Sequence, residues 1–212
     1  CSAGGHAILA GVIPTPAIAY LARKMQAQAG IVISASHNPF HDNGIKFFGG
    51  DGYKLPDAVE DELEKIVHRI EANDDLSRAN GSEVGTTEYR HDLLKQYMDF
   101  VMATTDERFE GMKIVLDCAN GAAYEAMPTI LHRLGAEVVV MSNKPNGTNI
   151  NADCGSTHLH ALQEAVVREK ADFGIAHDGD ADRCLCVDEK GEIIDGDRIL
   201  VMCATEMMNK GT

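Results

Sequence analysis

The sequence lacks tryptophan and is poor in aromatic residues, with only five tyrosines and six phenylalanines among 212 residues. Basic residues are also scarce: 19 Lys and Arg stand against 33 Asp and Glu, which gives a formal net charge of −14. Proteins that bind nucleic acids carry a basic surface and often aromatic platforms for base stacking. Both shortages argue against a nucleic-acid partner, and the negative charge argues against binding to an acidic membrane surface.

Closely paired cysteines are missing as well. The six cysteines are scattered, and no Cys-x-x-Cys pair occurs. Disulfide scaffolds and structural zinc sites depend on such pairs, so we expect reduced thiols in a cytoplasmic protein. Cys184 and Cys186 lie in an apolar run, which predicts that they share one face of a strand and are buried. Residues 7–22 are uncharged, but Pro14 and Pro16 interrupt them and no Lys or Arg precedes them, unlike a signal peptide or membrane span.

Strand-like and helix-like segments alternate along the chain. Strands are expected at residues 7–12, 31–35, 45–48, 113–117, 137–141, 172–176 and 184–188. Helices are expected at 15–30, 57–70, around 94–101, around 127–134, at 158–169 and at 195–212. For the first helix, Thr15 fits an N-cap, Pro16 fits the first helical position and Gly30 fits the end.

This alternation predicts βαβ units in an α/β fold, with mainly parallel, mixed sheets covered on both faces. The polar segment 71–88 predicts a boundary near residue 87. We therefore expect two three-layer α/β/α domains, at 1–87 and 88–190, and the start of a third domain at 191–212. The chain begins at Cys1 and ends just after a helix-like segment, so we also expect it to be a piece of a longer protein.

The first candidate site is the loop Ser34-Ala35-Ser36-His37-Asn38-Pro39, which directly follows a predicted strand. Loops at the carboxyl ends of strands are where α/β proteins build their sites. The loop offers the Ser36 hydroxyl, with His37 and Lys46 as nearby cations or proton carriers. Ser, His and Asn also favour ordinary turns, so the loop alone leaves function and plain turn structure equally open.

The second candidate site carries three carboxylates at alternate positions, Asp178, Asp180 and Asp182, between two predicted strands. Their mutual repulsion is relieved when a hard cation binds, and ligation by oxygen alone suits Mg²⁺ or Ca²⁺ rather than Zn²⁺. An EF-hand is disfavoured because Arg183 stands where that loop needs glycine and a strand follows. A haloacid-dehalogenase-type phosphatase is disfavoured because its D-x-D-x-[TV] pattern is not matched.

Taken together, the two loops resemble those of the α-D-phosphohexomutase superfamily. The similarity includes residues 30–48 (GIVISASHNPFHDNGIKFF) and 178–183 (DGDADR), and extends to 11–20, 117–122 and 146–151. Within the superfamily, the serine loop looks most like the branch that acts on glucosamine phosphate. Plain hexose mutases of the same superfamily, and a non-enzymatic Mg²⁺- or Ca²⁺-binding module, remain as alternatives.

The resemblance implies a role for each matching residue. Ser36 matches the serine that carries a phosphoryl group. Asp178, Asp180 and Asp182 match the metal ligands, and the phosphoserine oxygen of Ser36 would complete the Mg²⁺ site. The residues that match positions near the transferred phosphate or after the metal loop are His37, Lys46 and Arg183.

The resemblance also implies a reaction. A phosphoserine would exchange its phosphoryl group with a sugar phosphate through a bisphosphorylated intermediate, interconverting glucosamine 6-phosphate and glucosamine 1-phosphate. Members of the superfamily have four domains, so we expect this segment alone to be catalytically incomplete. The expected partner is a small sugar phosphate, not a nucleic acid or a membrane, and the sequence leaves the oligomeric state open.

Overall fold

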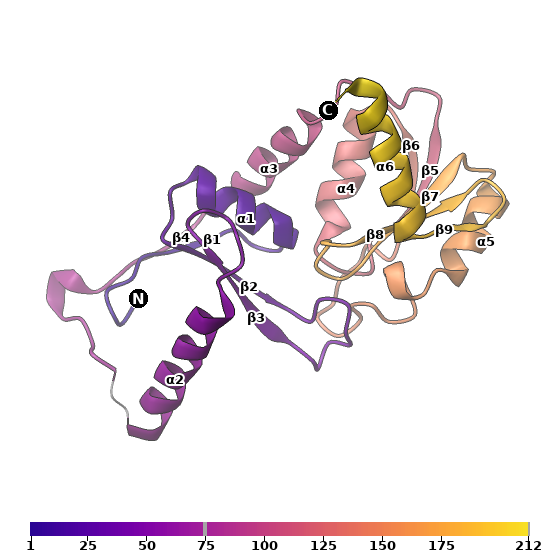
Figure 1. Cartoon of the computed structure of the whole chain (residues 1–212). Helices are drawn as coiled ribbons and strands as arrows, with labels where there is room; N and C mark the ends of the chain where they lie inside the picture. Colours follow the sequence, from indigo (N-terminus) through magenta and orange to yellow (C-terminus); the bar gives the residue numbers. More distant parts are fainter. Residues whose placement is uncertain (74–75, 212) are drawn as a thin grey trace.

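The computed structural model describes residues 1–73 and 76–211, which form two α/β units (Figure 1). The first unit contains β1 (Ala7–Leu9), α1 (Thr15–Lys24), β2 (Ala29–Ser34), β3 (Gly44–Gly49), α2 (Asp57–Asn73), the 3₁₀ turn η1 (Gly81–Glu83) and β4 (Thr87–Tyr89). The second contains α3 (Leu93–Met102), β5 (Lys113–Asp117), α4 (Ala123–Arg133), β6 (Glu137–Met141), the 3₁₀ turn η2 (Gly155–Thr157), α5 (His160–Glu169), β7 (Phe173–His177), β8 (Cys184–Asp188) and β9 (Ile193–Ile194). Helix α6 (Gly196–Lys210) follows.

The second unit is a five-stranded mixed sheet between helices. The strand order is β6-β5-β7-β8-β9, in which β6, β5 and β7 are parallel, and β8 and β9 are antiparallel to their neighbours. Alternate residues of β5 point to opposite faces: Val115 packs with α5, whereas Ile114 and Leu116 pack with α4. The α/β class and the layered, mainly parallel sheet predicted from the sequence are confirmed here.

The first unit is built from two strand pairs. β1 pairs in parallel with β4, and β2 pairs with β3 as an antiparallel hairpin whose register matches Ser34 with Gly44. The serine loop and Lys46 therefore sit at the same end of one hairpin. Strand β4 crosses the boundary expected at residue 87, and the division into 1–87, 88–190 and 191–212 remains a prediction.

Three helices join the two units. Helix α3 packs between α1 and α4 in one apolar cluster, as Figure 1 also shows. Its most buried side chains are Ala17 and Leu21 of α1, Leu93 of α3, and Ala126 and Ile130 of α4. This cluster fixes α1, and with it the first unit, against α4, a helix that covers one face of the five-stranded sheet.

Several local predictions need correction. Helix α1 ends at Lys24 rather than Gly30, which lies in β2, and Thr15 forms no side-chain N-cap bond. Cys184 is exposed and Cys186 half-buried, because the alternate residues Leu185 and Val187 are the ones that pack against the α5 side of the sheet. No helix in the described part of the chain is both long and apolar enough to cross a membrane.

Candidate active site

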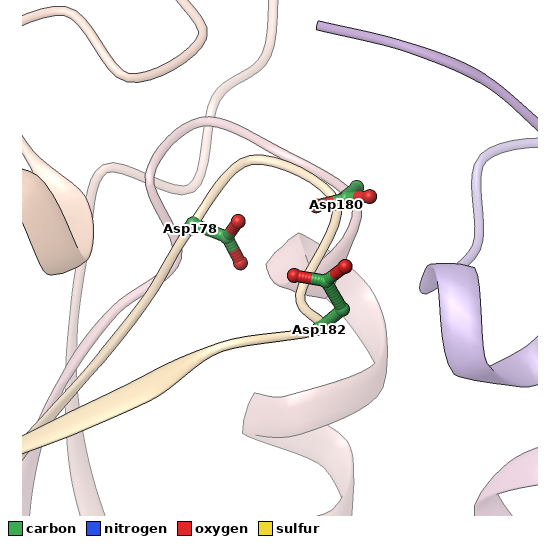
Figure 2. Close-up of side chains that lie close together, drawn as sticks. All are labelled: Asp178, Asp180 and Asp182. Atoms are coloured by element: carbon green, nitrogen blue, oxygen red, sulfur yellow. The ribbon is translucent and has the colours of Figure 1, made fainter. Parts of the chain in front are cut away.

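The three predicted carboxylates lie on one tight loop between the antiparallel strands β7 and β8 (Figure 2). Asp178, Asp180 and Asp182 each offer an oxygen atom, and these atoms lie within 4.8 Å of one another. Asp178 and Asp180 are buried, whereas Asp182 is exposed at the loop's rim. The loop therefore brings three like charges together, two of them out of contact with water.

Local backbone bonds give the loop this shape. The Ala181 N–H donates to the Asp178 carbonyl oxygen (3.0 Å), and the Arg183 N–H donates to Asp178 Oδ1 (3.1 Å). Ala181 has a left-handed backbone with φ 57°, which costs a non-glycine residue of the order of 1 kcal/mol. The alternating Asp residues can then converge because Gly179 and Ala181 place no large side chain between them.

The loop fits a hard divalent cation. Asp178 Oδ2 is buried and has no hydrogen-bond partner among the described residues. A buried carboxylate oxygen without a donor is costly, and a cation at the centre of the triad would satisfy it. The donor set is oxygen only, which suits Mg²⁺ or Ca²⁺.

The serine loop meets this triad from the other unit. The Ser36 hydroxyl donates to Asp180 Oδ1 at 3.2 Å, although the two residues are 144 positions apart. Ser36 has φ 54°, and its N–H donates to the Ser34 hydroxyl oxygen (3.0 Å). The structure thus brings the predicted serine and the predicted triad into one site.

Lys46 supplies a positive charge to the same site. Its Nζ lies 2.6 Å from Asp180 Oδ2, 3.2 Å from Asp182 Oδ2 and 3.3 Å from the Ser36 hydroxyl oxygen. The register of the β2–β3 hairpin explains this placement, because Lys46 pairs with Val32 close to the end of β2 from which the serine loop begins.

The neighbouring groups shift the pKa values of these side chains. Burial raises the pKa of Asp178 to about 6, and the nearby carboxylates of Asp180 and Asp182 add to the rise. Burial acts in the same direction on Asp180, but hydrogen bonds from Lys46 and Thr15 outweigh it and hold its pKa below the ordinary value. Partial burial would lower the pKa of Lys46, yet the bonds and charges of Asp180 and Asp182 leave it raised.

The last two predicted residues lie at the edge of the cluster. Arg183 Nε is 3.8 Å from Asp182 Oδ1, and its side chain is exposed. His37 is half-buried, and its Nδ1 has no hydrogen-bond partner among the described residues. Both remain predictions as functional residues.

Comparison with known proteins agrees with this geometry. The family model for phosphoglucomutase/phosphomannomutase alpha/beta/alpha domain I matches residues 1–74, and the model for domain II of the same family matches residues 91–191. The chain belongs to the phosphoglucomutase/phosphomannomutase family. Each of the two matched regions contributes one of the two loops.

Family members resemble the chain over its whole length. Proteins named phosphoglucosamine mutase from Desulforamulus reducens and from Pelotomaculum thermopropionicum are each 54% identical over all of this chain and 47% of their own. A crystal structure of a phosphoglucomutase/phosphomannomutase family protein from Burkholderia thailandensis aligns with a TM-score of 0.79 at 25% identity, covering 99% of this chain and 46% of the other. The chain thus spans about half the length of the curated relatives it matches.

Two side chains of the site were missed by the sequence analysis. Thr15 donates its hydroxyl to Asp180 Oδ2 (2.9 Å), and Asn151 donates its amide to the carbonyl oxygens of Ser36 (2.9 Å) and Asn38 (2.8 Å). By sequence, Thr15 fits a helix cap, and Asn151 belongs only to a segment similar to the phosphohexomutases. Both lie in segments that carried the family resemblance, which was the one available signal.

Proposed function

We propose that the intact protein is a Mg²⁺-dependent phosphohexomutase that interconverts glucosamine 6-phosphate and glucosamine 1-phosphate. The observation that carries the proposal is the Ser36 hydroxyl, held between Asp180 Oδ1 and Lys46 Nζ beside three convergent carboxylates. The choice of amino sugar is supported by 54% identity over the whole chain to proteins named phosphoglucosamine mutase.

In this proposal Ser36 is the phosphoryl carrier. Phospho-Ser36 donates its phosphoryl group to the free 1-hydroxyl of glucosamine 6-phosphate, which gives a bound 1,6-bisphosphate. The bisphosphate reorients and returns its 6-phosphoryl group to the Ser36 oxygen, which leaves glucosamine 1-phosphate. Each transfer exchanges a hydroxyl proton for a phosphoryl group, so the serine ends the cycle as it began.

The surrounding residues would hold charge and position. Asp178, Asp180 and Asp182, together with an oxygen of phospho-Ser36, would hold Mg²⁺. When bound, the cation would neutralise negative charge on the phosphoryl oxygens. Lys46 already touches the Ser36 oxygen and would offset charge during transfer.

Local cations are needed because the chain as a whole repels phosphate. The net charge is −14, and a phosphoserine adds roughly −1.5 to −2 at neutral pH. In the proposal, Lys46 offsets this charge next to Ser36, while Arg183 at the loop's rim and His37 beside Ser36 contact the phosphate during transfer. The partner is thus a sugar phosphate, and the scattered cysteine spacing favours a cytoplasmic location.

The test is turnover by the intact protein. Glucosamine, glucose and mannose 6-phosphates are compared as substrates, with and without Mg²⁺, for the wild type, Ser36→Ala and the exposed control Ser77→Ala. We expect glucosamine phosphate to be the best substrate, Ser77→Ala to be unaffected, and activity to vanish in Ser36→Ala or on chelation. Activity retained by Ser36→Ala would defeat the mechanism, and a preference for glucose or mannose phosphate would reassign the sugar.

A further inference from the structure

Hydrogen bonds cross between the two units in both directions at the site. Thr15 of the first unit bonds to Asp180 of the second, and Asn151 of the second unit bonds to the serine loop of the first. Each unit therefore supports the reactive group that the other unit supplies.

Thr15 holds Asp180 at two points. Its hydroxyl donates to Asp180 Oδ2 (2.9 Å), and its backbone N–H donates to the Asp180 carbonyl oxygen (2.8 Å). Thr15 is buried, and its hydroxyl makes no cap bond within α1. Because Asp180 Oδ1 accepts from the Ser36 hydroxyl, Thr15 fixes the oxygen on the opposite side of the same carboxylate.

Asn151 holds the serine loop in a strained shape. Its Nδ2 donates to the carbonyl oxygens of Ser36 and Asn38, and its own N–H is anchored to the Ala119 carbonyl oxygen (2.9 Å). Ser36 has φ 54°, a left-handed conformation that costs a non-glycine residue of the order of 1 kcal/mol. Asn151 is buried and itself has φ 58°, which asparagine tolerates better than most residues.

These bonds are not what joins the two units. The apolar cluster of α1, α3 and α4 already packs them together through side chains other than Thr15 and Asn151. The polar bonds are instead concentrated on the backbone of the serine and on the carboxylate that faces it. Second-sphere partners of metal ligands commonly orient the ligands in this way.

We propose that Thr15 and Asn151 form a reciprocal clamp that keeps Ser36 Oγ in register with Asp180 while a phosphoryl group arrives and leaves. Both are positioning residues, since neither reaches the reacting atoms except through Asp180 or the serine backbone. The proposal rests on the phosphoserine mechanism above.

The variants distinguish the effect of losing a side-chain hydrogen bond from the effect of changing the backbone conformation. Thr15→Val removes the hydroxyl at nearly constant volume, and Thr15→Ser keeps it. Asn151→Gly removes the amide but accommodates the left-handed backbone, so strain cannot explain its effect. Thr129→Val and Asn80→Gly are matched controls. The Thr129 hydroxyl donates to the Glu125 carbonyl oxygen within α4, and Asn80 is exposed and forms no side-chain cap bond in the described part of the chain.

Two readouts are taken on the intact protein. We expect kcat to fall about 10–100-fold in Thr15→Val and in Asn151→Gly, with KM for the sugar phosphate unchanged and with Thr15→Ser near wild type. Hydrogen–deuterium exchange of residues 34–44 should speed up in Thr15→Val and Asn151→Gly and stay slow in both controls. In the double variant Thr15→Val/Asn151→Gly, the fold-loss of kcat should be smaller than the product of the two single fold-losses. This is expected because both residues maintain the same distance, that between Ser36 Oγ and Asp180.

Wild-type kcat and unchanged exchange in the single variants would overturn the clamp, as would losses that multiply independently. Failure of the proposed function is a different result: wild-type protein would then show no turnover and no phosphoserine. The exchange rates of residues 34–44 would still decide whether Thr15 and Asn151 hold the loop.

Discussion

Lys46 of β3 forms a 2.6 Å ion pair with Asp180 of the β7–β8 loop, a residue 134 positions later in the chain. The same Nζ lies 3.3 Å from the Ser36 hydroxyl oxygen. One amine thus connects the group proposed to carry phosphate with the central carboxylate of the triad, and it joins the two units at the point where chemistry is proposed.

Replacing Lys46 should slow phosphoryl transfer. Lys46→Met keeps the aliphatic length but removes the charge beside the Ser36 oxygen, so we expect kcat to fall about 100-fold, the usual loss for one charge-stabilising donor. Lys54→Met is the matched control, because the exposed Lys54 ammonium pairs with Asp57 and Glu60, away from Ser36 and the triad. Steady-state kinetics on both variants measure the difference, and equal activity in the two would contradict a role for Lys46 in transfer.

Replacing Asp180 should abolish cation binding without unfolding the protein. Asp180→Asn keeps the shape of a buried side chain but removes the charge shared by Lys46 and the metal site. We expect no Mg²⁺ binding in titration calorimetry and a circular dichroism spectrum close to that of the wild type. Loss of the folded spectrum would instead assign the loop a structural role.

Stabilisation by Mg²⁺ should depend on pH through Asp178. Folding raises the pKa of Asp178 from 3.8 to about 6, so the folded state binds this proton more tightly than the unfolded state does. The resulting contribution to the free energy of unfolding is fully present below about pH 4 and is lost as pH rises through 6. Mg²⁺ needs the carboxylate form and must displace the proton in acid. The rise in Tm on adding Mg²⁺ should therefore be small near pH 5 and larger near pH 7.5, values on either side of about 6.

Asp178→Asn provides the control for this prediction. In the metal-free variant the decline in Tm between about pH 4 and 6 should be reduced, because the titrating group is gone. A Mg²⁺-induced shift in the wild type that is equal at both pH values would show that Asp178 does not titrate with the site.

The two loops should not tolerate a methyl group at Gly179. A Cβ there would lie 2.5 Å from the Ser36 carbonyl oxygen and 2.6 Å from Ile150 Cδ1, and the backbone oxygen cannot move aside alone. Gly179→Ala should lower the free energy of unfolding by about 1–3 kcal/mol. It should also reduce activity, because the added methyl group pushes the Ser36 loop away from the three aspartates. Gly196→Ala, whose Cβ would meet open space, should leave both quantities nearly unchanged in urea unfolding and turnover assays.

The sequence predicted the elements that are defined by their own residues. Strands β5, β6 and β8 have the expected bounds, since each is a short apolar run closed by polar residues. It missed β4 and the two-residue β9, because their pairing partners β1 and β8, rather than their own composition, make them strands.

The sequence predicts which residue types form the site, but only some of the contacts between them. Three alternating aspartates indicate a cation site by their residue type alone. Ser36 and Lys46 are candidates from the loop that follows a strand, and the family resemblance implies their roles. Thr15 was assigned to a cap because a threonine before proline fits that pattern, while its bond to Asp180 spans 165 positions. Polar contacts between residues far apart in the chain produce no periodic pattern in the local sequence. For the same reason, the contact of Asn151 with the serine loop could not be predicted.

The covalent state of Ser36 is the decisive test of the proposed phosphoserine mechanism. The intact protein, purified without phosphatase treatment, is digested and its peptides are analysed by mass spectrometry before and after incubation with glucosamine 6-phosphate. We predict one phosphoryl group on Ser36, which is lost to the sugar and regained during turnover. A protein that turns over substrate with Ser36 unmodified at every stage would contradict phosphoryl transfer through this serine.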